Sequence, residues 1–174
     1  LSLIVDYDSR DNMFTPGKGG FMEAELATVR DWLGASVEYN TLALRGFYYQ
    51  PLTTGWILGM RGDSRQVGEQ APFFAQPYIS LRGVPAMRYQ DQQTLVGEAE
   101  LRWDMTPRWA LLGFGGVGKA YGQRSNWSEA GSVAAGGVGF RYLIARKLGL
   151  YSGIDVARGP ETTALYLQVG SAWR

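Results

Sequence analysis

The stretch from Gly97 to Met105 reads GEAELRWDM, and its residues alternate in chemical character. One parity is charged, with Glu98, Glu100, Arg102 and Asp104, and the other holds Gly97, Ala99, Leu101, Trp103 and Met105. A period of two predicts a β-strand with two chemically opposed faces. The fold depends on which of these faces lies inside.

The composition leaves room for a protein that crosses a membrane with strands. Of 174 residues, 45% are hydrophobic and 19% are charged, as in many soluble domains, but 24 glycines and 13% aromatic residues exceed the usual share. No run of about 18 apolar residues occurs, so we expect no transmembrane helix. Strands of a membrane barrel need only ~10 residues with every second one apolar. The mean hydropathy of -0.17 is consistent with such strands.

Cysteine and histidine are both absent from the sequence. We therefore expect no disulfide, no thiolate nucleophile, no zinc site built from these ligands and no histidine base, and we predict no catalytic residues, no cofactor and no metal site. The formal net charge of +1 gives no basic surface for nucleic acid. The N-terminus, LSLIVDYDSR, has neither a basic segment nor a small-residue cleavage site, and it reads like the interior of a longer chain.

Nine segments have the pattern of strands. No segment has the pattern of a long amphipathic helix, because glycine recurs every few residues in the candidate segments. The fold class is therefore predicted to be all-β, with antiparallel strands in a meander. The expected strands span residues 1–9, 20–31, 36–49, 55–64, 94–105, 108–120, 131–145, 148–157 and 162–173.

Short and long connections alternate along most of the chain. PLTTG, MTPR and ARKLG are tight turns, whereas residues 64–93, 121–131 and 158–161 are longer and carry Gly, Pro and polar residues. This asymmetry is typical of outer-membrane barrels, which have short periplasmic turns and longer outer loops. The short-turn rim would also carry an aromatic girdle of Trp56, Trp103, Trp109 and Trp173. The alternative is a soluble β-sandwich with tryptophans in its core.

The two faces of the strands then receive an assignment. In a membrane barrel the charged parity faces a wet lumen and the apolar parity faces lipid. The same split recurs around Glu23 and Glu25, around Arg141 and around Asp155. Several residues on the predicted lumen face are small, which indicates that space is left for a further group inside the barrel. These small residues are Ala135, Gly137, Gly139 and Gly153.

Two motif-like patterns have plainer interpretations. GFGGVG at 113–118 matches a dinucleotide-binding pattern, but a loop follows it where that fold needs a helix. We interpret these glycines as positions of close backbone approach in a twisted strand. Glu98 and Glu100 would lie ~7 Å apart on one strand face, a spacing that glycosidases use. Arg102 shares that face, which favours an ion-paired wall over a tuned acid.

The segment PFFAQPYISLRGVPAMRYQ carries a more specific signal, because a long loop with LRGVPAMRY follows one hairpin and precedes a strand of alternating charge. It resembles the inward-folded loop of the BamA/TamA outer-membrane family (bacterial surface antigen superfamily), whose motif is an Arg-Gly pair preceded by an aliphatic residue and usually followed by an aromatic one. YDSRDNMFTPGKGG, GVGFRYLIA, GIDVARGPE and LYLQVGSAW resemble further parts of the family, so the resemblance covers most of the chain.

This resemblance implies roles for individual residues. Arg82 would be the loop arginine that reaches into the lumen, and Glu100 would be its carboxylate partner. A guanidinium bound by carboxylates is a directional anchor for a loop that is entropically costly to hold, and Gly83 would let the backbone turn close to the wall. Val84 replaces the usual aromatic residue, and glycines stand at positions 115 and 116, where the family usually has an aspartate. The anchor is therefore expected to be reduced, or shared with Glu98.

The last strand resembles the terminal signal that is recognised during barrel assembly, because LYLQVGSAW ends in an aromatic residue followed only by Arg174. Gly170 would permit an inward kink that weakens the seam to the first strand. Alternation predicts that the residues facing lipid are Leu165, Leu167, Val169 and Trp173, and that those facing the lumen are Tyr166, Gln168, Gly170 and Ala172. The candidate signal residues are Tyr166, Val169, Gly170 and Trp173.

Residues 1–174 are therefore predicted to be the C-terminal portion of a transmembrane antiparallel β-barrel in the bacterial outer membrane, with a long inward-folding loop at about 64–93. An odd number of strands cannot close such a barrel, so missing strands or a second chain are expected to complete about 16 strands by the resemblance. The implied role is insertion, assembly or translocation of outer-membrane proteins, without enzymatic activity, with the bilayer and those proteins as partners. Two alternatives stay open: an anchor and exporter for a fused enzyme such as a patatin-like lipase, and a soluble ligand-binding barrel.

Overall fold

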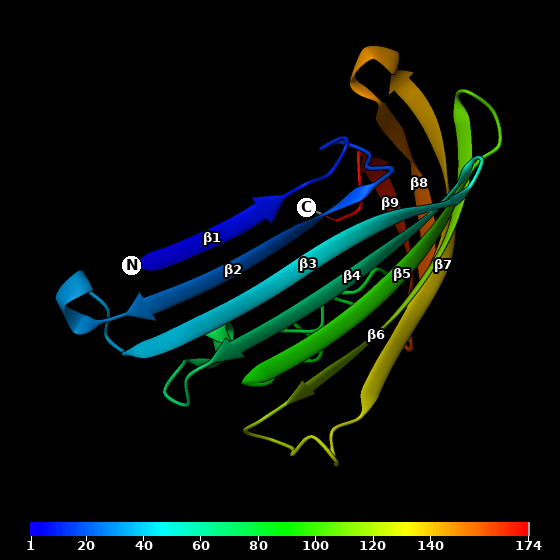
Figure 1. Ribbon diagram of the computed structural model, residues 1–174. Coiled ribbons are helices and arrows are strands. Elements are labelled where there is room, and N and C mark those ends of the chain that lie inside the picture. Colours follow the sequence, from blue (N-terminus) through cyan, green and yellow to red (C-terminus); the bar gives the residue numbers. More distant parts are fainter. Residues whose placement is uncertain (174) are drawn as a thin grey trace.

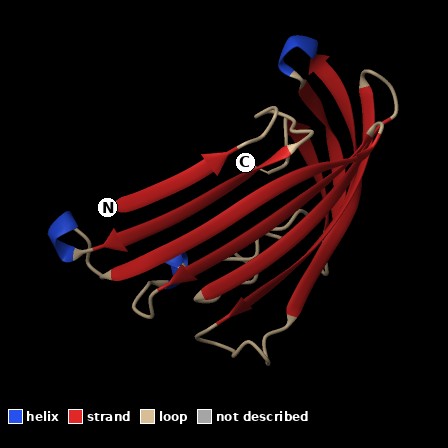
Figure 2. Cartoon of the chain, viewed as in Figure 1, coloured by secondary structure: helices blue, strands red, loops and turns tan. Residues whose placement is uncertain are grey.

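The computed structural model describes residues 1–173, and its regular structure consists of nine strands and three short 3₁₀ helices (Figure 2). The strands are β1 (Ser2–Asp8), β2 (Gly19–Val29), β3 (Tyr39–Thr53), β4 (Trp56–Val67), β5 (Gln93–Asp104), β6 (Trp109–Tyr121), β7 (Ser132–Ala145), β8 (Leu150–Arg158) and β9 (Thr163–Val169). The 3₁₀ helices lie in connections and are η1 (Asp31–Leu33), η2 (Phe73–Ala75) and η3 (Arg146–Leu148). The predicted all-β class is confirmed. Within the described residues, no helix has the length and hydropathy needed to cross a membrane.

All nine strands form one antiparallel sheet in which each strand pairs with its neighbours in the sequence. The sheet curves around a concave side, and β1 and β9 are its two edges (Figure 1). No pairing joins β1 to β9 in the part of the chain that is described. The predicted meander, and the prediction that these strands do not close on themselves, are therefore confirmed.

Pairing aligns the alternating residues into rows that run across the sheet. One row joins Phe47, Arg61, Glu98 and Gly116, and the adjacent row joins Tyr48, Met60, Ala99 and Gly115. The first row faces the concave side, where Glu98 is buried, and the second row faces outward, where Met60 is exposed. The charged parity of residues 97–105 thus faces the concave side of the sheet.

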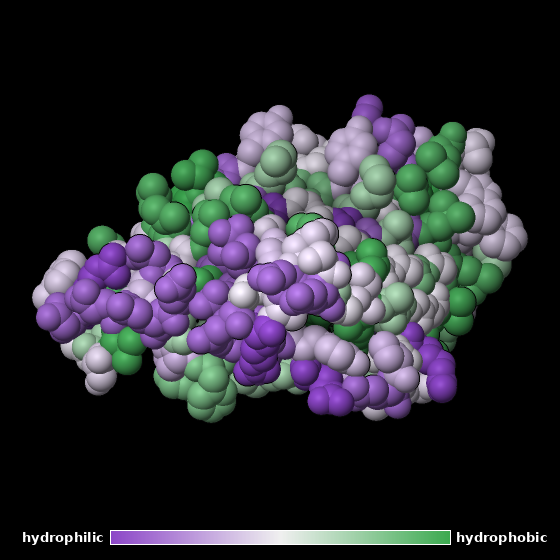
Figure 3. All heavy atoms as spheres, turned by 90° about the horizontal axis from the view of Figure 1, so that it is seen from below, coloured by the Kyte–Doolittle hydropathy of each residue, from purple (hydrophilic) through white to green (hydrophobic). Residues whose placement is uncertain are grey.

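The outward face of the sheet is largely apolar and exposed. Side chains from strands at both edges and in the middle share this property, among them Leu3, Met22, Leu44, Leu101, Val138, Leu165 and Leu167. Seen from the end that carries the β6–β7 connection, the molecule has hydrophilic residues across much of its near surface and hydrophobic residues along its right-hand flank (Figure 3). A soluble sheet would bury such a face against another layer.

The connection between β4 and β5 folds onto the concave side of the sheet. It spans residues 68–92, because β4 continues to Val67 and β5 begins at Gln93, so the predicted bounds of 64–93 were slightly too wide. An isolated bridge between Tyr78 and Gln90 holds its two arms together. Three apolar residues of this loop, Ile79, Leu81 and Val84, are buried against the sheet. They form one cluster with Val96 of β5 and Val133 of β7.

Glycines in β6 make room for this loop. A Cβ on Gly118 would lie 2.5 Å from the Ile79 side chain, and one on Gly116 would lie 2.7 Å from Leu81. Both glycines belong to GFGGVG, so the expected close approach is present, and the approaching segment is the loop. Ala135, one of the small residues predicted to leave space on the inner face, also packs against this cluster. At this position the loop fills the predicted space.

The end of the chain departs from the predicted alternation. β9 ends at Val169, and Gly170 has a φ of +81°, which turns the chain inward. Ser171 then donates its backbone N–H to the carbonyl of Phe14, 2.5 Å away, in the β1–β2 connection. Trp173, predicted to face lipid, is instead only 4% exposed and packs on the concave side. The prediction failed because β9 ends at Val169, so the alternation does not continue, and Ala172 and Trp173 both pack on the concave side.

Three of the four predicted girdle tryptophans do lie on the outward face beside short turns. Trp56 and Trp103 stack with ring centroids 5.4 Å apart, and Trp109 lies 4.7 Å from the Tyr142 ring. Trp173 does not belong to this group, because its indole lies between the rings of Phe47 and Tyr49 on the concave side.

Candidate functional site

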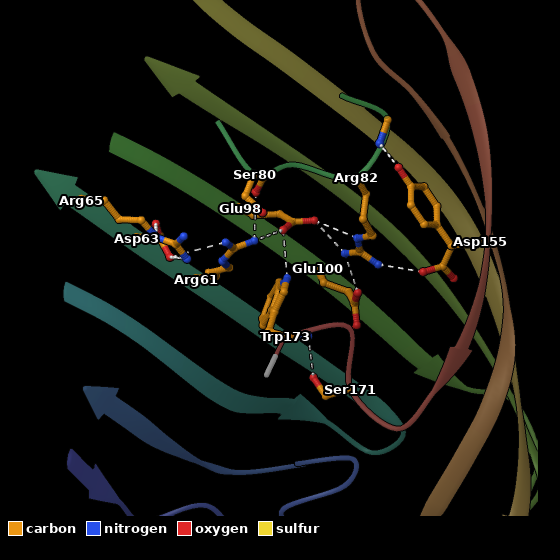
Figure 4. Close-up of polar contacts among 12 residues, drawn as sticks. Arg61, Asp63, Arg65, Ser80, Arg82, Glu98, Glu100, Asp155, Ser171 and Trp173 are labelled. Carbon is orange, nitrogen blue, oxygen red and sulfur yellow. Dashed lines mark hydrogen bonds and ion pairs between the residues drawn. The ribbon is translucent and has the colours of Figure 1, made fainter. Parts of the chain in front are cut away.

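The tip of the long loop presents Arg82 to the concave wall of the sheet. The side chain is 8% exposed and contacts three carboxylates, those of Glu98, Glu100 and Asp155 (Figure 4). Nε donates to Glu98 Oε1 at 2.9 Å, Nη2 donates to Glu100 Oε2 at 2.8 Å, and Nη1 donates to Asp155 Oδ2 at 2.9 Å. The predicted contact with Glu100 is present, and so is the predicted sharing with Glu98.

The sheet supplies these partners from two separate strands. Glu98 and Glu100 are two residues apart on β5 and therefore point to the same face. Asp155 comes from β8, beyond β6 and β7, and pairs in register with Gly139, whose missing side chain leaves room for the carboxylate. Curvature of the sheet brings the two strands within reach of one guanidinium.

An aromatic ring completes the surroundings of the guanidinium. The Cζ atom of Arg82 lies 3.4 Å from the ring centroid of Phe114 on β6. A cation over an aromatic face gains further attraction, especially where water is excluded. The planar guanidinium is thus bonded at its edges and covered on one face, an arrangement that a lysine cannot reproduce.

Two of the three carboxylates hold a second arginine. Glu98 Oε2 lies 3.4 Å from Arg61 Nη1, and Asp155 binds Arg141 through both of its oxygens. The charges of this buried network therefore alternate in sign, and each carboxylate that loses water gains donors in exchange. The network extends along β4, because Arg61 also lies 3.6 Å from Asp63.

Gly83 follows the arginine and lies directly against the β8–β9 turn. Its φ is +90°, and a Cβ there would lie 2.9 Å from backbone atoms of Arg158 and Gly159. Its N–H donates to the hydroxyl of Tyr166, 2.9 Å away on β9. The predicted close turn of the backbone at Gly83 is present, and only glycine fits this position without strain.

The base of the loop is tied to the neighbouring β6–β7 connection. Asp91 is 2% exposed, and its carboxylate accepts hydrogen bonds from the backbone N–H groups of Gln123 and Arg124. Gln76 adds a side-chain hydrogen bond to Gln123 at 3.1 Å. Both arms of the loop are therefore fixed near the rim.

An exposed contact joins the loop to the β8–β9 turn. Arg88 and Tyr89 both hydrogen-bond the Glu161 carboxylate, each at 2.9 Å. The hydrogen bond from Arg88 lowers the pKa of Glu161 below its ordinary value of 4.5, and the Tyr89 hydroxyl acts in the same direction. The same bond to Glu161 raises the pKa of Arg88.

The C-terminal segment reaches the same network from the other side. Trp173 Nε1 donates to Glu98 Oε2 at 2.9 Å. Its indole fits against Gly59, where a Cβ would lie 2.9 Å from the ring. The hydroxyl groups of Tyr49 and Ser171 are 2.9 Å apart and fix the turn that precedes the tryptophan.

The predicted residues fall into two groups in space. Arg82, Gly83, Glu98 and Glu100 come together as one site, and Tyr166 and Trp173 adjoin it through single hydrogen bonds. Val169 lies on the outward face of the sheet and is 47% exposed. Gly170 is the kink itself.

Sequence reasoning missed Asp155 as a ligand of Arg82. The alternation in GIDVARGPE did place this aspartate on the charged face, but its distance from Arg82 depends on the register of three strand pairs and on the curvature of the sheet. Asp155 gives Arg82 a third carboxylate partner, although glycines stand at positions 115 and 116, where the resemblance led us to look for an aspartate.

This arrangement is suited to holding a loop in place. The guanidinium stays protonated at every accessible pH and is surrounded by its carboxylates. Glu98 and Glu100 are both engaged with Arg82, as expected for an ion-paired wall. Among residues 1–173, no group of three or more acidic side chains has the geometry of a metal site.

Comparison with models of known protein families gives no match for this sequence, and comparison with curated proteins gives no significant match.

Proposed function

We propose that this chain is a portion of an outer-membrane β-barrel that resembles the BamA/TamA family and takes part in inserting, assembling or translocating outer-membrane proteins. The observation that carries the proposal is the loop arginine Arg82, bound by Glu98, Glu100 and Asp155 on the concave side of the sheet. A loop with the sequence LRGVP, folded inward and anchored in this way, is what the resemblance implies.

The outward face supports a membrane location. Leu167 is 79% exposed and Val138 65%, and both lie among further exposed apolar residues on the same face of the sheet. Hydrocarbon solvates such a face, whereas water penalises it by about 25 cal/mol per Å². Buried charges on the concave side and apolar residues outside are the polarity of a membrane barrel rather than of a soluble one.

The open edges support the view that further strands complete the barrel. Every residue of β1 is exposed, and its outer edge carries unpaired backbone groups. An unpaired strand edge is too costly to persist in lipid. Strands from the same chain or from another chain would pair there, giving about 16 strands by the resemblance.

The mechanism follows from unequal pairing around such a barrel. β9 offers only Thr163–Val169 for pairing, because Gly170 turns the chain inward, whereas β5 pairs along Gln93–Asp104. A seam at β9 therefore has few hydrogen bonds, and an incoming strand can add at its edge. The anchored loop bonds β5, β8 and β9 through Glu98, Asp155 and Tyr166, so it holds these strands together on the inner side while the outer edge of β9 accepts the incoming strand.

The test is reconstitution of the full-length protein in liposomes, followed by addition of a urea-unfolded outer-membrane protein. Folding of the added protein is read from its heat-modifiable migration on gels. We expect faster folding than in protein-free liposomes, and slower folding with Arg82→Ala than with the unchanged protein. Equal rates with and without the protein would contradict the assembly role. A Gly-x-Ser-x-Gly motif upstream in the full-length sequence would instead favour the anchor of a patatin-like lipase.

A further inference from the structure

A surface pocket of about 570 Å³ lies at the rim that carries the short turns. The β5–β6 turn is joined there to the end of β7, since Leu143 donates its N–H to the carbonyl of Arg108 at 2.8 Å, and the β7–β8 turn follows directly. Side chains from these two turns and the end of β7 line the pocket, and they include Arg108, Tyr142, Ile144, Arg146, Lys147 and Leu148.

The pocket concentrates positive charge without acidic partners. Arg108, Arg146 and Lys147 are all exposed, and Arg108 donates to the hydroxyl of Tyr142 at 2.7 Å. In the described part of the chain, none of these three cations lies within ion-pair distance of a carboxylate. The arginines of the concave side, such as Arg61 and Arg141, are by contrast all ion-paired. Exposed, unpaired cations that converge on one pocket favour an anionic ligand.

Apolar and aromatic side chains continue from the pocket onto the outward face. Ile144 is 53% exposed and Leu148 51%, and the rings of Trp109 and Phe140 lie 6.1 Å apart on the same face. A ligand that satisfies both surfaces has an anionic end and an apolar body. Tryptophan and tyrosine rings are favoured at the depth where lipid headgroups meet acyl chains.

We propose that this pocket binds the headgroup of an anionic phospholipid from the periplasmic leaflet. The inference rests on the proposed function, which puts the short-turn rim at that leaflet. The lipid phosphate accepts hydrogen bonds from Arg108, Arg146 and Lys147, and the acyl chains lie along Ile144 and Trp109. A bound lipid at this position fixes the β7–β8 hairpin relative to the bilayer surface and sets the depth of the barrel beside the seam.

The test compares two charge-matched double variants of the full-length protein in mild detergent. Arg146→Gln with Lys147→Gln removes two pocket cations, and Arg124→Gln with Arg158→Gln removes two exposed arginines near the other rim. Phosphatidylglycerol and phosphatidylcholine are titrated separately, and inorganic phosphate is then added to the phosphatidylglycerol complex. Bound lipid is counted by native mass spectrometry. We expect phosphatidylglycerol to bind the unchanged protein and the control variant alike, and to bind the pocket variant about 30-fold more weakly.

The other outcomes are also decisive. Equal binding of phosphatidylglycerol and phosphatidylcholine, or equal losses in both double variants, would overturn the headgroup site while leaving the membrane barrel intact. Displacement of the lipid by millimolar inorganic phosphate would show a site for free anion rather than for lipid, and would also overturn it. Failure of the unchanged protein to enter liposomes at all would overturn the proposed function itself, so the two failures are distinguishable.

Discussion

Replacing Arg82 by alanine removes the guanidinium from between Glu98, Glu100 and Asp155. Loss of one partner from a buried ion pair costs ~3–5 kcal/mol. The lower end applies here, because Glu98 keeps Arg61 and Asp155 keeps Arg141, and because the Glu100 side chain is 17% exposed and can recruit water. We therefore expect a loss of ~3 kcal/mol from the stability of the folded loop.

Hydrogen exchange of the backbone amides at residues 79–84, followed by mass spectrometry, measures this loss directly. A cost of ~3 kcal/mol corresponds to exchange about 100-fold faster in the variant. The exchange rate in Arg82→Lys should lie between those of the unchanged protein and Arg82→Ala, because an ammonium cannot bond the three carboxylates in one plane. Arg88→Ala, which removes an exposed contact of the same loop, serves as the control and should leave these amides unchanged. Unchanged exchange in Arg82→Ala would refute the role of the network as the anchor.

Three further outcomes are expected. Gly118→Val should destabilise the fold by ~1–3 kcal/mol in urea unfolding, because the new side chain overlaps the loop, whereas Gly113→Val, with open space around its Cβ, should be nearly neutral. The contact between Arg88 and Glu161 should be intact at neutral pH and lost as the pH falls through the lowered pKa of Glu161. Hydrogen exchange of the backbone amides at residues 159–162 should therefore accelerate in acid, and Glu161→Gln should abolish this pH dependence. Trp173→Phe should cost ~1–2 kcal/mol through the lost indole hydrogen bond, and Trp173→Ala ~3–5 kcal/mol, both as shifts of the urea midpoint.

The strands and the sides they present could be predicted from the sequence because alternation is a local property. In GEAELRWDM the polarity of each residue fixes its face, and the pairing partners are simply the adjacent strands. The link from Arg82 to Glu98 and Glu100, which both lie on β5, was implied by the family resemblance of the loop, and the alternation supplied only the face on which both carboxylates lie.

Features that depend on curvature or on a single backbone angle could not be predicted in the same way. Asp155 reaches Arg82 only because the sheet bends β8 toward β5, and no local pattern encodes that bend. Trp173 was assigned to the wrong face because alternation was extended through Gly170, whose positive φ ends β9. The sequence analysis predicts the kink at Gly170, but the residues after it, Ala172 and Trp173, both pack on the concave side and follow no alternation.

We expect the outward face of this sheet to meet lipid and the concave face to meet water. The chain has no cysteine, so one cysteine introduced by Leu167→Cys or by Gln168→Cys can carry one spin label. These adjacent positions lie on opposite faces of β9, and each labelled variant is measured in liposomes. We expect the label at Leu167, where the native side chain is 79% exposed, to collide with oxygen and to be shielded from a water-soluble nickel chelate. The label at Gln168 should show the reverse. Equal access of the nickel chelate to both positions would contradict the claim.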